Sequence, residues 1–75
     1  MKLFFFGQLA EVTGKSDMEI LNIPDTDSLL KKLETDFPKL KNLKFQISVD
    51  RKISKGNVKL ENGSEIALLP PFAGG

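Results

Sequence analysis

One amphipathic segment constrains the fold of this chain more than any other feature. Its apolar residues recur at the three- and four-residue spacings of a single helical face: Leu29, Leu30, Leu33 and Phe37. Asp25, Thr26 and Asp27 offer side chains for the N-cap and first turn. Pro38 follows, where a proline removes a backbone hydrogen bond and clashes with an earlier carbonyl. The sequence therefore predicts one principal helix that ends near Phe37.

The segment before this helix predicts two strands and a short helix. Residues 3–6 are apolar without alternation, which predicts a strand covered on both faces. Residues 8–13 predict a short helix with Gly14 as its left-handed cap. Residues 17–23 alternate and then change phase, as in a strand with a bulge or an irregular edge, and Pro24 ends them.

The segment after the helix predicts further strands. Phe45, Ile47 and Val49 alternate with Gln46, Ser48 and Asp50, which indicates a strand with one face on a core and the other in water. Asn62-Gly63 is typical of a tight hairpin turn with two positive φ angles, and residues 65–69 then form a last strand.

This order of elements predicts an α+β fold, with a mixed sheet packed on one main helix. We interpret it as a ubiquitin-like β-grasp. A chain of 75 residues without linker or repeat is expected to form one domain over residues 1–69, followed by a flexible tail over residues 70–75. Five phenylalanines are assigned to the core, with one face of residues 4–6 available to dock a partner: Phe4, Phe5, Phe6, Phe37 and Phe45.

The composition excludes several classes of function. The chain has no cysteine and no histidine, so disulfides, thiolate nucleophiles, imidazole bases and the usual zinc ligands are all absent, and we predict no metal site. A formal net charge of +1 gives no field able to hold a nucleic-acid backbone. The N-terminal apolar run is shorter than the core of a signal peptide, so we expect a cytoplasmic protein without a membrane partner.

The chemistry is expected at the end of the chain, in six residues with little side-chain bulk beyond an apolar anchor: Pro70, Pro71, Phe72, Ala73, Gly74 and Gly75. The two prolines impose an extended backbone, and the two glycines leave the terminal carboxyl open to approach from either side. A Gly-Gly end alone also describes a frayed terminus, but its place behind two prolines and directly after a strand favours a functional tail. A carboxylate is a poor electrophile, so its use requires ATP-dependent conversion to an acyl-adenylate.

Three stretches carry a resemblance to a known family. They are Phe4-Phe5-Phe6-Gly7-Gln8-Leu9 with Glu11 and Gly14, Leu60-x-Asn62-Gly63-x-Glu65-Ile66-Ala67, and Pro70-Pro71-Phe72-Ala73-Gly74-Gly75. Together they span nearly the whole chain, which resembles the small subunit of molybdopterin synthase. The chain departs from the family pattern at Ser64, where Asp is common, at Phe72, where Val is usual, and at Asp50, where Asn is frequent.

The resemblance implies a sulfur carrier with no bound cofactor. In that family an activating enzyme uses ATP to adenylate the terminal glycine, which Gly75 matches, and a persulfide donor supplies the sulfur of a thiocarboxylate. The loaded tail inserts into a large subunit, in a complex of two small and two large subunits, and donates sulfur to cyclic pyranopterin monophosphate. The chain is then a non-autonomous part of a sulfurtransferase.

Three alternatives stay open from the sequence. A sulfur carrier of the thiamin pathway shares the fold and the Gly-Gly end, although the Pro-Pro-Phe-Ala tail argues against it. A ubiquitin-like modifier would instead join Gly75 to a lysine. A β-grasp interaction module would have no activated terminus at all.

Overall fold

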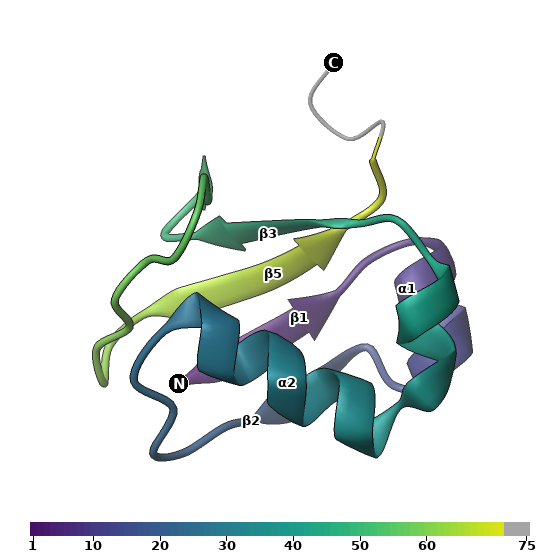
Figure 1. Ribbon diagram of the computed structural model, residues 1–75, viewed down its shortest axis with the longest axis horizontal. Coiled ribbons are helices and arrows are strands. Elements are labelled where there is room, and N and C mark those ends of the chain that lie inside the picture. Colours follow the sequence, from purple (N-terminus) through teal and green to yellow (C-terminus); the bar gives the residue numbers. More distant parts are fainter. Residues whose placement is uncertain (72–75) are drawn as a thin grey trace.

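The computed structural model describes residues 1–71 and contains five strands, two α-helices and one 3-10 helix within that range (Figure 1). In chain order the elements are β1 (Lys2–Phe5), α1 (Gln8–Thr13), β2 (Asp17–Glu19), α2 (Thr26–Asp36), the 3-10 helix η1 (Pro38–Asn42), β3 (Gln46–Val49), β4 (Lys52–Ile53) and β5 (Glu65–Leu69). The strand order in the sheet is β2-β1-β5-β3-β4.

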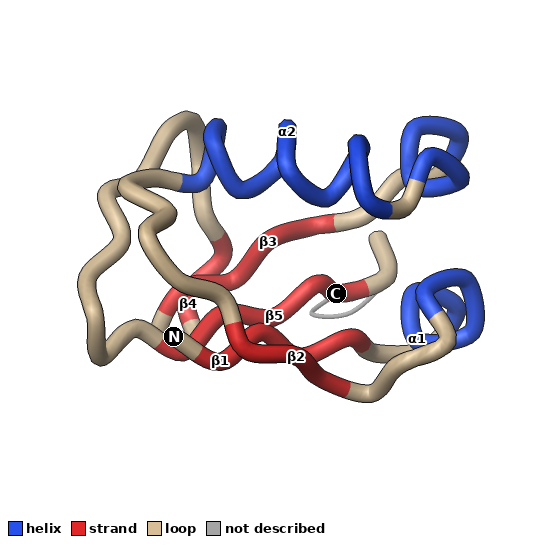
Figure 2. The backbone as a smooth tube through the Cα atoms, turned by 90° about the horizontal axis from the view of Figure 1, so that it is seen from below, coloured by secondary structure: helices blue, strands red, loops and turns tan. Residues whose placement is uncertain are grey.

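The molecule has two layers, with α2 lying across one face of the sheet (Figure 2). β1 and β5 are parallel neighbours at the centre, and the other neighbouring strands pair antiparallel. This mixed sheet with one main helix is the ubiquitin-like β-grasp, so the predicted fold class is confirmed. The predicted flexible tail covers residues 70–75, of which residues 72–75 lie outside the described residues.

Local sequence signals account for both ends of α2. Asp25 has an extended backbone, and its side chain accepts a hydrogen bond of 2.9 Å from the backbone N–H of Ser28. This bond to the backbone stabilises the carboxylate and lowers the pKa of Asp25. At the other end the Phe37 N–H donates to the Leu33 carbonyl at 2.7 Å before Pro38 interrupts the helix. The predicted helix boundaries are confirmed.

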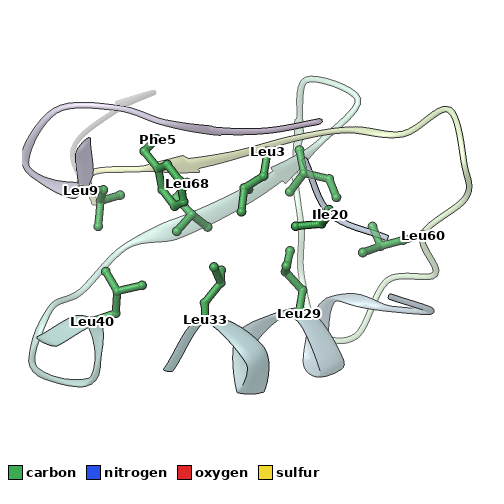
Figure 3. Close-up of a cluster of buried hydrophobic side chains, with 10 residues drawn as sticks. Leu3, Phe5, Leu9, Ile20, Leu29, Leu33, Leu40, Leu60 and Leu68 are labelled. Carbon is green, nitrogen blue, oxygen red and sulfur yellow. The ribbon is translucent and has the colours of Figure 1, made fainter. Parts of the chain in front are cut away.

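The core lies between α2 and the sheet (Figure 3). Leu29 and Leu33 point from α2 toward Leu3 and Leu68 on the two central strands. Leu9 of α1 and Leu40 of η1 close one end of this layer (Figure 3). Burying a leucine side chain contributes about 2 kcal/mol, so this layer is the main source of stability.

The prediction that the first strand is covered on both faces is wrong. Leu3 and Phe5 are buried beneath α2, whereas Phe4 is half-buried and Phe6 is 48% exposed. Side chains alternate between the faces of a strand, and α2 covers one face only. Of the other phenylalanines assigned to the core, Phe37 and Phe45 are half-buried and pack against it.

The second strand is shorter than the predicted segment. It ends at Glu19, after which Ile20 is buried and Leu21 is 71% exposed. Asn22 adopts a positive φ of 60°, which takes the chain out of the sheet.

The positive-φ hairpin turn lies elsewhere than predicted. Neither Asn62 nor Gly63 has a positive φ in the structure, and their turn is closed by Ser64, whose N–H donates to the Glu61 carbonyl and whose Oγ accepts from the Glu61 N–H. The positive angles instead occur at Asp50 (51°) and Arg51 (69°), between β3 and β4. Asp50 tolerates this conformation and also pairs with Glu65, donating its N–H at 2.8 Å and accepting the Glu65 N–H on Oδ1 at 3.0 Å.

One further expectation about β3 is wrong. Ser48 was expected in water but is buried, because it lies between Ala67 of β5 and Ile53 of β4 in the register of the sheet. Ile47 and Val49 pack against the core as predicted.

Candidate functional site

The site expected from the sequence begins where β5 leaves the sheet. β5 ends at Leu69, Pro70 is half-buried and Pro71 is exposed. Phe72, Ala73, Gly74 and Gly75, the other predicted site residues, lie outside the described residues. The structure therefore defines the base of the tail, at the end of a central strand (Figure 1).

Two features end the parallel ladder between β1 and β5 at this point. The N–H of Phe6 donates to the Leu68 carbonyl at 3.1 Å, and in a parallel ladder the Phe6 carbonyl would next accept the N–H of residue 70. Residue 70 is a proline and has no N–H. The Phe6 carbonyl instead accepts the N–H of Leu9 at 3.1 Å, which begins α1. β1 and β5 therefore both end at this level of the sheet.

The sheet face opposite α2 carries apolar side chains next to this exit. Phe4 and Phe6 belong to it because they alternate with the buried Leu3 and Phe5, and their ring centroids lie 6.4 Å apart. On β5 the half-buried Ala67 and Leu69 alternate with the buried Ile66 and Leu68, and Ala67 lies directly opposite Phe4. We call this set the open face: Phe4, Phe6, Ala67 and Leu69.

The rest of the described chain offers little chemistry. No group of carboxylates in residues 1–71 could hold a metal ion. A hollow of about 760 Å³ lies between α2 and β3 and has Lys41, Lys44 and Lys55 among its lining residues. Asp25 has a lowered pKa, but its carboxylate is occupied as a helix cap. No helix in this range has the length and apolarity to cross a membrane.

The fold and the tail base define the class of this protein. It is a small ubiquitin-like β-grasp protein in which the last central strand ends beside an apolar sheet face. The chain matches the ThiS family over residues 3–75 and belongs to that family.

Similar proteins have been characterised by sequence and by structure. The chain is 28% identical over 80 residues to the molybdopterin synthase sulfur carrier subunit of Mycobacterium tuberculosis, covering 100% of this chain and 96% of the relative. Its fold matches the solution structure of small archaeal modifier protein 1 from Methanosarcina acetivorans, with a TM-score of 0.79, 21% identity, and coverage of 99% of this chain and 94% of the other.

A third match is a complex. It contains subunits 1 and 2 of the molybdopterin-converting factor from Helicobacter pylori, and the TM-score is 0.71 at 22% identity, covering 99% of this chain and 96% of the matched one. The resemblance to the small subunit of molybdopterin synthase is thereby supported at the level of family and fold.

In the sequence, Gly7 stands out only as part of the family resemblance and as the residue after the predicted first strand. In the structure the Pro70 ring, at the base of the tail, lies where a side chain at position 7 would have to go. The only sequence signal for a special role of Gly7 was its place directly between a strand and a helix. Its neighbour Pro70 is 63 positions away in the sequence and comes close only through the register of β1 and β5.

Proposed function

We propose that this protein is the sulfur-carrier subunit of a molybdopterin synthase and that Gly75 carries the sulfur. The observation that carries the proposal is the match to the ThiS family over residues 3–75, together with full-length similarity to a molybdopterin synthase sulfur carrier subunit. The six-residue ending Pro70-Pro71-Phe72-Ala73-Gly74-Gly75 supplies the expected reactive tail.

The body of the protein suits a carrier because it provides a fixed base for the tail. β5 is held between β1 and β3, so the last residue of the sheet, Leu69, has little freedom to move. The apolar open face adjoins this base and offers a docking surface. A partner that binds the open face would therefore receive the tail at a defined place.

The proposed chemistry uses the terminal carboxylate as the reactive group of the chain. An activating enzyme converts the Gly75 carboxylate and ATP into an acyl-adenylate and pyrophosphate, since an ionised carboxylate resists nucleophilic attack. The terminal sulfur of a persulfide donor then attacks the adenylate and displaces AMP, and a second thiol of the donor cleaves the resulting acyl disulfide, which leaves a thiocarboxylate on Gly75 and a disulfide on the donor. The chain has no cysteine or histidine, so the acid-base groups of both steps belong to its partners.

The proposed acceptor is cyclic pyranopterin monophosphate, bound on a large subunit. A thiocarboxylate sulfur is more nucleophilic than a carboxylate oxygen, and holding it in a closed site raises its effective concentration. The structural similarity to one chain of a complex of subunits 1 and 2 supports a large-subunit partner. We propose an assembly of two small and two large subunits in a cytoplasmic pathway.

Intact-mass spectrometry tests the proposal. Incubation with ATP, an activating enzyme and a sulfur source is expected to raise the mass by the difference between sulfur and oxygen. Deleting Gly75 is expected to abolish this shift without changing the melting temperature, because the tail contributes little to the core. One residue added after Gly75 should abolish it as well. Normal loading of the truncated chain would refute the assignment.

Two alternatives remain, each with its own support. Similarity to a small archaeal modifier protein favours a modifier, which would form isopeptide bonds to lysine in extracts containing ATP and the activating enzyme. Membership of the ThiS family is equally compatible with a thiamin-pathway carrier. The loaded protein offered to a molybdopterin synthase large subunit and to a thiazole synthase would separate the two carrier functions by which one consumes the thiocarboxylate.

A further inference from the structure

Gly7 has a backbone conformation that other residues rarely adopt. Its φ is 56° and its ψ is −133°, a region that is essentially restricted to glycine. Its carbonyl accepts the N–H of Ala10 at 3.1 Å, so this conformation also starts α1. Extending the register of β1 and β5 by two residues places Gly7 opposite Pro70.

The Pro70 ring occupies the space that a side chain at position 7 would need. A Cβ atom built on Gly7 would lie 2.9 Å from Pro70 Cγ and 3.8 Å from Pro70 Cδ. Carbon atoms in favourable contact are about 3.5–4.0 Å apart, so the two groups could not both keep their places. Gly14, at the other end of α1, also has a positive φ (74°), but nothing lies within 4 Å of a Cβ built there.

We infer that Gly7 is a positioning residue: it seats the Pro70 ring and thereby sets the direction in which the tail leaves β5. The consequence for loading rests on the proposed function of Gly75. Pro71 follows directly and its ring fixes φ, so a changed direction at Pro70 is carried into the start of the tail. Loading should be sensitive to such a change, because misplacement of a reacting group by about 1 Å can cost about a hundredfold in rate.

Four variants test this inference in the full chain: Gly7→Ala, Pro70→Ala, the double variant, and Gly14→Ala as a matched control. Gly7→Ala is expected to lower the kcat of loading at least roughly tenfold, with little change in KM because the open face is intact. In the double variant the added methyl group meets no ring and only the backbone strain at position 7 remains, so its kcat should recover most of the way to that of Pro70→Ala. Gly14→Ala places an alanine at another positive φ (74°) at the other end of α1 without a clash, so it should lose melting temperature but load normally.

Residual dipolar couplings of the Ala73 and Gly74 amides, referred to the sheet, supply a readout that does not depend on loading. They are expected to change in Gly7→Ala and to match those of Pro70→Ala in the double variant. Wild-type loading by Gly7→Ala, a double variant as slow as Gly7→Ala, or equal slowing by Gly14→Ala would overturn the inference. If the wild-type chain does not load with a competent enzyme, the proposed function fails, and the couplings still decide whether Gly7 directs the tail.

Discussion

Replacing Phe6 by alanine should weaken binding to the large subunit strongly if the open face is the docking surface. An aromatic side chain buries about 150–250 Å², and Phe6 is 48% exposed, so roughly 100 Å² remains for a partner to cover. At about 25 cal/mol per Å² this area corresponds to about 2.5 kcal/mol. The dissociation constant should therefore rise about 60-fold.

Isothermal titration calorimetry of the carrier against the large subunit measures this effect. Leu21→Ala is the matched control, because Leu21 is also an exposed apolar residue (71%) but lies far from the open face. It follows β2, beside the start of β1, at the end of the sheet opposite to the base of the tail. Thermal melting should verify that both variants fold. A dissociation constant within about threefold of wild type for Phe6→Ala, or an equal loss for Leu21→Ala, would refute docking through the open face.

Two further predictions concern stability. Thr26→Val should lower the free energy of unfolding, measured by urea titration, by about 2 kcal/mol, because the Val58 N–H loses its acceptor, the buried Thr26 Oγ1 at 2.9 Å. Thr26→Ser keeps this acceptor and should stay near wild type. An equal loss of stability in both variants would contradict this account. The lowered pKa of Asp25 means that its contribution to stability is complete above the unfolded value of 3.8 and is lost as the pH falls through the folded pKa. Asp25→Asn keeps a cap that does not titrate, so the denaturation midpoint of this variant should fall less steeply with acid than that of wild type; parallel curves would count against the cap as the cause.

Much of the fold follows from short-range signals. The N-cap at Asp25, the leucine spacing of α2 and the stop at Pro38 act within a few residues, and the structure reproduces the predicted helix. The short helix before Gly14 is likewise local and matches its predicted bounds. Such signals are readable because one turn of helix and its caps depend on neighbours in the chain.

Other features were misread because they depend on the partner strand. The positive-φ turn was predicted at Asn62-Gly63 from residue type, but it occurs at Asp50 and Arg51, where the side chain of Asp50 also binds the backbone of Glu65. Likewise Ser48 is polar in an alternating strand, yet the register between Ala67 and Ile53 buries it.

The candidate site divides in the same way. The sequence by itself predicted which residues form the tail and determined that the chain brings neither cysteine nor histidine to the chemistry. Only the tertiary structure decided which face of β1 stays open and that Gly7 meets Pro70. The physical reason is that composition and local conformation belong to the chain, whereas burial and contact arise only when strands far apart in sequence pair in one register.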